Sequence, residues 1–222
     1  MVSRILERIE GIRNKTLPPD VPVEETKPKA FNVEDEEKID VAGTESAAYR
    51  HASFGNVPPK FSFDSATQNR IKEIVRQLVT EEQPVTHSYV KRRMADLMHM
   101  ENPWRLDSLI NDVLETCSCK WYPNLKQTTI FATEEDRTNY EGHRSLEGRE
   151  IEEIPIEELT NAMHYLVEQQ VSVPTKELKR LTAHLVGKAL RGKDLMNCLD
   201  TAIEMLKASG KIVERNETLS LA

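Results

Sequence analysis

The chain has 222 residues, of which 38% are hydrophobic and 30% are charged, and 30 Lys and Arg against 37 Asp and Glu give a formal net charge of −7. The sequence has no apolar run of about 18 residues, which excludes a transmembrane helix. Three cysteines are too few for a disulfide scaffold, and only eight glycines argue against an enzyme fold that cradles phosphates.

The N-terminal region of the sequence divides into a helical segment and a linker. Apolar residues recur at helical spacing over residues 1–14, which predicts a short amphipathic helix; they are Ile5, Leu6, Ile9 and Ile12. Charged side chains interrupt this segment, so it does not resemble a secretory leader, and we expect a cytoplasmic protein. Residues 15–60 are rich in Pro and Glu and predict an extended N-terminal arm that is largely disordered.

Residues 61–132 predict the first folded domain. Its first helix carries an apolar stripe over residues 71–79, and Thr86 is placed to cap the second helix. A third helix is expected within residues 106–117. Two short runs of strand-forming residues flank a turn and predict a β-hairpin over residues 120–131.

An acidic linker over residues 133–150 separates this domain from a second one, residues 151–222, with the same order of elements. Two equal spacings of seven residues mark the repeat: Leu78 to Val85, and Leu166 to Val173. When the sequence of the first domain is shifted by 88 or 89 residues, nearly all of its apolar positions through the third helix align with apolar positions of the second domain. The two domains therefore form an internal repeat.

The order of helix, short strand, helix, helix and hairpin is that of a winged helix, a helix-turn-helix derivative whose third helix usually reads DNA. The sequence thus predicts a mainly α fold with small β-wings, in which two tandem winged-helix domains follow the N-terminal arm. Two unrelated small helical domains are the alternative interpretation.

The second domain resembles a domain of unknown function. The residues that carry the resemblance are Ile154-Pro155-Ile156-Glu157-Glu158-Leu159, Leu166-Val167-Glu168, Gly187-Lys188, Arg191-Gly192-Lys193 and Gly210-Lys211-Ile212. In the family it resembles, this domain belongs to the C-terminal, tandem winged-helix-like tail of large bacterial superfamily-one DNA/RNA helicases with a Vsr-like endonuclease domain. Residues 4–10 are similar to the helix that closes that nuclease. The resemblance implies a helicase or nuclease as protein partner.

The chemistry of that family does not extend to this sequence. A P-loop needs a glycine-rich loop that ends in Lys-Ser or Lys-Thr, and the sequence contains neither that motif nor a recognisable nuclease carboxylate cluster. We therefore expect no enzymatic activity, no cofactor and no small-molecule substrate.

The cysteines do not predict a metal site. A zinc site needs about four ligands at suitable spacing, whereas Cys117 and Cys119 form an isolated C-x-C pair and Cys198 is far away in the sequence. Cys117 and Cys198 fall on apolar stripes, so we expect buried thiols. The paired acids Glu157-Glu158 are placed at the start of a helix, where the helix dipole stabilises carboxylates. We therefore interpret them as residues that stabilise the helix end and not as catalytic residues.

Lys and Arg clusters are the strongest functional signal. The predicted nucleic-acid-binding residues are Lys188, Arg191, Lys193, Lys211 and Arg215 in the second domain, and Lys91, Arg92, Arg93, Arg105 and Lys126 in the first. Cations beside the start of a helix can bind phosphate. Carboxylates on the third helices, such as Asp112 and Asp200, oppose this interpretation because they would repel a phosphate backbone. Trp104 and Trp121 are interpreted either as packing residues of the wing or as stacking residues for single strands.

The sequence is compatible with two functions. The first is a non-catalytic accessory module that positions DNA or RNA for a helicase and nuclease system. The alternative is a winged-helix protein-interaction module that docks a partner through its helices and N-terminal arm without direct DNA binding. The basic clusters favour the first and the acidic balance favours the second. Convergence of the basic residues on one face would discriminate between them.

Overall fold

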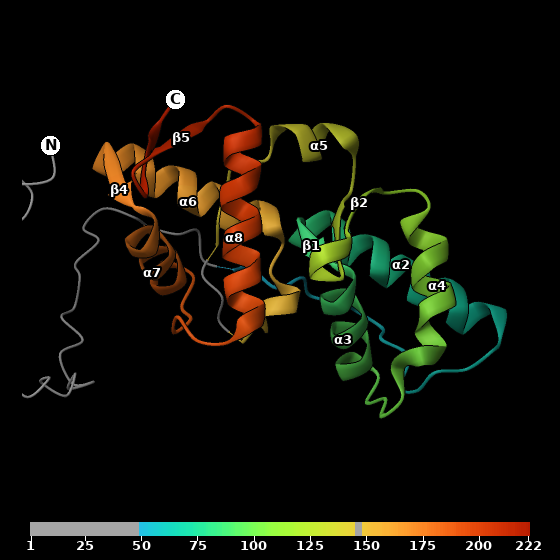
Figure 1. Cartoon of the computed structure of the whole chain (residues 1–222). Helices are drawn as coiled ribbons and strands as arrows, with labels where there is room; N and C mark the ends of the chain where they lie inside the picture. Colours follow the sequence, from blue (N-terminus) through green and yellow to red (C-terminus); the bar gives the residue numbers. More distant parts are fainter. Residues whose placement is uncertain (1–48, 145–147) are drawn as a thin grey trace, which may run out of the picture. The chain divides into compact units, whose positions relative to one another are not determined.

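The computed structural model describes residues 49–144 and 148–222 of the chain. This part is mainly helical with two small antiparallel sheets (Figure 1), which confirms the predicted mainly α class with small β-hairpins. The helix predicted over residues 1–14 and most of the arm predicted over residues 15–60 lie outside the described residues. In the described ranges, no helix combines the length and the apolar character needed to cross a membrane.

The first half of the described chain, residues 49–133, combines three α-helices with a three-stranded sheet in the order β1-β3-β2 (Figure 1). In chain order its elements are α2 (Ser65–Glu82), β1 (Val85–Thr86), α3 (His87–Leu97), the 3-10 helix η1 (Pro103–Leu106), α4 (Asp107–Leu114), β2 (Ser118–Tyr122), the 3-10 helix η2 (Pro123–Leu125) and β3 (Gln127–Phe131).

Local sequence explains where the helices of the first half begin. Asp64 accepts a hydrogen bond from the backbone N–H of Thr67 at 2.8 Å and caps α2. Thr86 accepts one from the N–H of Tyr89 at 3.2 Å and caps α3, as predicted. The apolar stripe over residues 71–79 is buried and packs with side chains of α3, α4 and β3 into one core.

The second half, residues 150–222, repeats this order of elements with a sheet ordered β4-β6-β5 (Figure 1). The helices α3 and α7 have eleven residues each, and both of their bounds are displaced by the 88 residues that the apolar spacing predicts. The elements are the 3-10 helix η3 (Ile151–Glu153), α6 (Ile156–Gln170), β4 (Ser172–Pro174), α7 (Thr175–Leu185), α8 (Lys193–Ala208), β5 (Ile212–Arg215) and β6 (Thr218–Leu221).

Helix α8 ends at Ala208, two residues before Gly210. Gly210 has a φ of 68°, a left-handed conformation that glycine adopts without strain. The N–H of Lys211 then donates to the carbonyl oxygen of Leu206 at 3.0 Å, which satisfies a backbone acceptor in the last turn of the helix. The chain thereby turns back into the β5–β6 hairpin, whose Leu219 is buried in the core of the second half.

Residues 49–60, which the sequence assigns to the linker, pack against the first half. Ala52 is buried, and its N–H donates to Oε1 of Glu82 at 2.9 Å. Tyr49, Phe54 and Val57 contact the core of the first half. Because these apolar side chains complete that core, the folded part of the chain begins before residue 61.

A connector, residues 134–149, joins the two halves. It begins with α5 (Glu134–Asn139), which Thr133 caps by accepting the N–H of Asp136 at 3.1 Å. Two arginines of the connector, Arg144 and Arg149, lie at the junction between the halves, and Arg149 is only 1% exposed. A segment with an acidic composition therefore supplies one buried cation, Arg149, and one that is 12% exposed, Arg144.

The carboxylate of Glu158, on α6, accepts hydrogen bonds from both arginines. Arg149 donates from Nη1 and Nη2 at 3.2 and 3.1 Å, and Arg144 donates from Nε at 3.1 Å. Arg144 also donates to the carbonyl oxygen of Glu82, the last residue of α2, at 2.7 Å and to that of Pro84 at 2.5 Å. Because Glu158 is fully buried, its charge is tolerated only with such partners. These contacts join the two halves.

Tyr49 lies against both guanidinium groups. Its ring centroid is 4.6 Å from Cζ of Arg144 and 4.4 Å from Cζ of Arg149. Its hydroxyl donates to Oε2 of Glu82 at 2.5 Å, and Tyr89 donates to the same oxygen at 2.6 Å. Burial and the hydrogen bond to Glu82 raise the pKa of Tyr89 to about 12, so this phenol stays a neutral donor. We call these residues the junction cluster: Tyr49, Glu82, Tyr89, Arg144, Arg149 and Glu158.

Gln127 makes a second contact between the halves. Its Nε2 donates to the carbonyl oxygen of Ile154 at 2.6 Å, and its Oε1 accepts from the N–H of Ile156 at 3.1 Å. Gln127 is buried, as are both of these residues. The side-chain amide therefore satisfies backbone groups at the start of α6 that would otherwise be buried without partners.

Replacing Gln127 with Leu is expected to lower the free energy of unfolding by about 1–3 kcal/mol, because a buried N–H and a buried carbonyl lose their partner. Urea unfolding followed by far-ultraviolet circular dichroism measures this change. Gln169→Leu, at an exposed position of α6, is the matched control and is expected to change stability by less than about 0.5 kcal/mol. Equal effects of the two substitutions would show that the contact does not stabilise the junction.

Candidate nucleic-acid interface

The segment that leads into α8 holds the densest group of predicted cations. Lys188 and Arg191 lie in the loop between α7 and α8, and Lys193 is the first residue of α8. Gly187 and Gly192 in this loop have φ values of 71° and 89°, which favour glycine. Gly192 is the N-cap of α8 and offers no side-chain acceptor to the first N–H groups of the helix.

A cavity of about 440 Å³ lies between the start of α8 and the β2–β3 hairpin of the first half. The turn η2 of this hairpin contacts α8. Lys126, which follows η2, and Lys193, on α8, both line the cavity. Its polar lining also includes Ser88, Asn124 and Asn197. The cavity is therefore built by both halves.

A smaller cavity of about 210 Å³ adjoins the first, since Ile151 and Asp194 line both. Lys188 and Arg191 line this second cavity. The structure thus brings four of the ten predicted cations to one continuous surface. We call them the α8 basic surface: Lys126, Lys188, Arg191 and Lys193.

Carboxylates accompany these cations without neutralising all of them. Glu150, Glu152 and Asp194 line the two cavities, and Nζ of Lys188 is 4.0 Å from Oε2 of Glu150. None of the ion pairs in the described part of the chain involves the other three cations of the α8 basic surface. Exposed cations of this kind are available to phosphate groups, and salt screens their attraction.

The predicted cluster Lys91-Arg92-Arg93 on α3 does not form one patch. Nζ of Lys91 is 2.8 Å from Oδ1 of Asp107, and Nη2 of Arg92 donates to Oε2 of Glu153 at 2.8 Å, across the junction of the halves. Arg93 is half-buried. Successive residues of a helix point about 100° apart, so three consecutive side chains diverge. In this structure Lys91 and Arg92 form ion pairs within the protein.

The other predicted cations lie apart from the α8 basic surface. Arg105 is exposed in η1, with its Cζ 5.5 Å from the ring centroid of Trp104. Arg215 is exposed at the end of β5. Lys211 lines a third cavity, of about 400 Å³, between the connector and the second half. These three residues do not extend the α8 basic surface.

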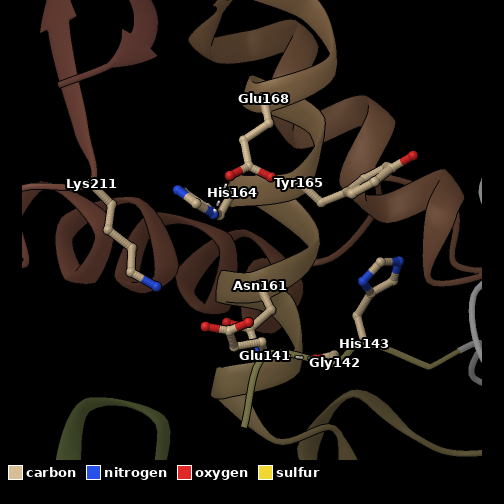
Figure 2. A pocket seen from close by; sticks show the side chains of 8 residues that line it. All are labelled: Glu141, Gly142, His143, Asn161, His164, Tyr165, Glu168 and Lys211. Carbon is tan, nitrogen blue, oxygen red and sulfur yellow. Dashed lines mark hydrogen bonds and ion pairs between the residues drawn. The ribbon is translucent and has the colours of Figure 1, made fainter. Parts of the chain in front are cut away.

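Figure 2 shows the third cavity, with the Lys211 ammonium on one side and the rings of His143 and Tyr165 on the other. Asn161 donates from Nδ2 to the carbonyl oxygen of Gly142 at 3.0 Å and so holds the connector against α6. Burial lowers the pKa of His143, which keeps its imidazole neutral at neutral pH. Two glutamates and one lysine line this cavity, so its charges oppose one another and do not favour an anion.

The exposed faces of the two third helices carry carboxylates that are partly neutralised from within the protein. Nζ of Lys72, on α2, is 2.6 Å from Oδ2 of Asp112 on α4. Lys179, on α7, pairs in the same way with Asp200 on α8. Lys72 and Lys179 therefore form ion pairs within the protein. Helix α4 itself contains no Lys or Arg.

The three cysteines are free thiols that differ in their burial. Cys198 is buried beside the larger cavity, as expected, while Cys117 is half-buried and Cys119 is exposed. Burial raises the pKa of the Cys198 thiol to about 11, so it is not a thiolate at neutral pH. Across residues 49–144 and 148–222, no group of three or more His, Cys, Asp or Glu side chains is placed to hold a metal ion.

Sequence reasoning missed the polar residues that complete the larger cavity. Asn197 follows Lys193 by four residues, a helical spacing that places both on one face of α8 and was a usable local signal. Ser88 and Asn124 reach the cavity only because η2 packs against α8, which no local pattern indicates.

Comparisons of the chain with protein-family models, with curated proteins and with solved structures gave no match. The function is therefore inferred from the residues of this chain and from their geometry.

Proposed function

We propose that the chain is a non-catalytic nucleic-acid-binding accessory module whose α8 basic surface contacts phosphate groups of DNA or RNA. The observation that carries this proposal is the convergence of Lys126, Lys188, Arg191 and Lys193 on two adjoining cavities. Cations that neutralise phosphates release condensed counterions, which supplies affinity without base specificity.

The order of elements in each half supports a tandem winged-helix fold. In both halves the short first strand pairs with the last strand of the hairpin, β1 with β3 and β4 with β6. In winged helices the third helix and the wing are the usual contacts to nucleic acid. Here the third helix of the second half and the wing of the first half line the same cavity, so one composite site draws on both domains.

The resemblance to helicase tails supports a place beside a helicase or nuclease. In this proposal the module holds DNA or RNA while the protein partner performs the chemistry. Four cations with acidic neighbours imply a modest, salt-sensitive affinity. Such an affinity suits an accessory contact better than a primary binding site.

Fluorescence anisotropy of labelled DNA and RNA across a salt series tests the proposal. A variant of the full chain with Lys126, Lys188, Arg191 and Lys193 changed to Gln is expected to bind at least about tenfold more weakly at low salt, because its phosphate contacts are lost. The slope of the logarithm of affinity against the logarithm of salt concentration is expected to fall by up to about 3.

A control variant removes the same number of positive charges from exposed positions outside the two cavities: Arg50, Lys60, Arg76 and Lys176, each changed to Gln. We expect this variant to keep the wild-type salt slope. Equal losses in the two variants would contradict a localised surface. Absence of wild-type binding at low salt would remove the direct nucleic-acid role.

A protein-interaction module is the second candidate, and two exposed tryptophans favour it. Trp104 is 64% exposed and Trp121 is 55% exposed, and both belong to the first half. Large aromatic side chains are enriched at the centres of protein interfaces. If wild-type protein fails to bind nucleic acid, this function becomes the better account of the fold.

A further inference from the structure

The first half covers one side of the start of α8. The turn η2 contacts α8, and Ser88 and Lys126 from the first half line the larger cavity together with Lys193 and Asn197. A helix that reads duplex DNA enters a major groove about 12 Å wide, with a phosphate backbone on each side. One flank of α8 instead contacts the turn η2 of the first half, so this flank is not open to a second phosphate backbone.

Duplex binding would also bring phosphates close to acidic surfaces. Glu115 is exposed next to α4 without an ion-pair partner in the described part of the chain, whereas the exposed carboxylates of Asp112, Asp200 and Glu204 are each partly neutralised by a lysine. Cations are concentrated at the start of α8 and at the turn after η2. A single strand has one backbone, so it can follow this short basic track without meeting the carboxylates further along the helices.

An exposed tryptophan lies on the hairpin whose turn lines the larger cavity. Trp121, on β2, pairs with Thr128, which is two residues beyond Lys126. These two paired residues share one face of the hairpin, whereas Gln127 faces the second half. Lys126 and Trp121 therefore lie on opposite sides of the turn η2 in the chain, and only Lys126 lines the cavity. Exposed aromatic rings near cations are the usual stacking platforms for unpaired bases.

We propose that the α8 basic surface receives a single strand of DNA or RNA in preference to a duplex, and that a base of this strand stacks on Trp121. This inference rests on the proposed function and adds the class of ligand. The backbone follows Lys188, Arg191, Lys193 and Lys126, and the stacked base lies beyond the hairpin turn. Stacking uses the face of a base and not its edge, so little base specificity is expected.

Tryptophan fluorescence isolates the stacking site because Trp104 and Trp121 are the only two tryptophans of the sequence. In Trp104→Phe the sole remaining tryptophan is Trp121, and its emission is expected to be quenched when the full-length variant binds an oligothymidine of about 20 nucleotides. Trp121→Phe, which retains Trp104, is the matched control and is expected to show little quenching.

Anisotropy measurements then compare the same oligothymidine with its duplex of equal length. We expect the wild-type chain to bind the single strand at least about tenfold more tightly, and Trp121→Ala to lower only that affinity, by at least about fivefold. Duplex binding as tight as single-strand binding, or an unquenched Trp121, would overturn the inference while leaving the cation contacts of the proposed function intact. Failure of both nucleic acids to bind at low salt would overturn the proposed function as well.

Discussion

Glu158→Gln is expected to lower the free energy of unfolding by about 3–5 kcal/mol, because it leaves buried charges without a counter-charge. The wild-type carboxylate pairs with both Arg144 and Arg149 at the junction of the halves. Arg149 has 1% of its surface exposed, so water cannot replace the lost partner. The amide keeps the size of the side chain, so the effect reports charge and hydrogen bonding and not a cavity. The ring of Tyr49 would remain as a neighbour, but it carries no compensating charge.

Urea unfolding followed by circular dichroism measures this loss. Glu168→Gln makes the same chemical change on the same helix at a residue with 46% of its side chain exposed, and we expect it to alter stability by less than about 0.5 kcal/mol. A loss below about 1 kcal/mol for Glu158→Gln would mean that the two guanidinium groups find other acceptors, and that the junction cluster does not depend on this carboxylate.

Leu78→Ala and Leu166→Ala, at equivalent positions of the two halves, are each expected to lower the free energy of unfolding by about 3–5 kcal/mol. Both side chains are buried, with 0% and 1% exposed, so each substitution leaves a cavity in the core of its half. The junction cluster and Gln127 tie the halves together. We therefore expect either substitution to shift one common unfolding transition and not to split it in two.

Two optical probes test this cooperativity. Circular dichroism reports the helices of both halves, whereas tryptophan fluorescence reports only the first half, which contains Trp104 and Trp121. Coincident urea curves are expected for the wild type and for both variants. If helical signal is lost in Leu166→Ala before the fluorescence changes, the second half unfolds alone and the junction does not couple the two cores.

Local patterns in the sequence were sufficient to predict most of the helices. The apolar stripe over residues 71–79, the capping hydroxyl of Thr86 and the stop at Gly210 each act within a few residues of the chain. Such features depend on helical periodicity and on backbone hydrogen bonds at helix ends, which the sequence displays directly.

The junction cluster could not be predicted in this way. Arg144 and Arg149 belong to a segment whose acidic composition indicates a solvated linker. Their placement depends on Glu158 and on Tyr49, which lies 95 residues before Arg144 and 100 residues before Arg149. Charged side chains are buried only when distant partners meet them. A pattern confined to neighbouring residues therefore cannot reveal such a cluster.

The basic surface was predictable only in part for the same reason. Lys188, Arg191 and Lys193 lie within one loop and helix start, so proximity in sequence indicates proximity in space. Lys126 joins them because the hairpin of the first half contacts α8. Lys91 and Arg92 are also adjacent in sequence, but helical geometry and nearby carboxylates direct them to separate ion pairs. The sequence does not show which carboxylate each cation will meet.

The two sheets differ in how their outward faces are covered. Phe131 of β3 is fully buried and stacks edge-on with Tyr140 of the connector, whereas Ser220, at the equivalent place in β6, is partly exposed. The two sheets therefore present unlike outward faces. Tyr140 of the connector covers Phe131 in the first half, whereas Val213, which pairs with Ser220 in the second sheet, is 36% exposed.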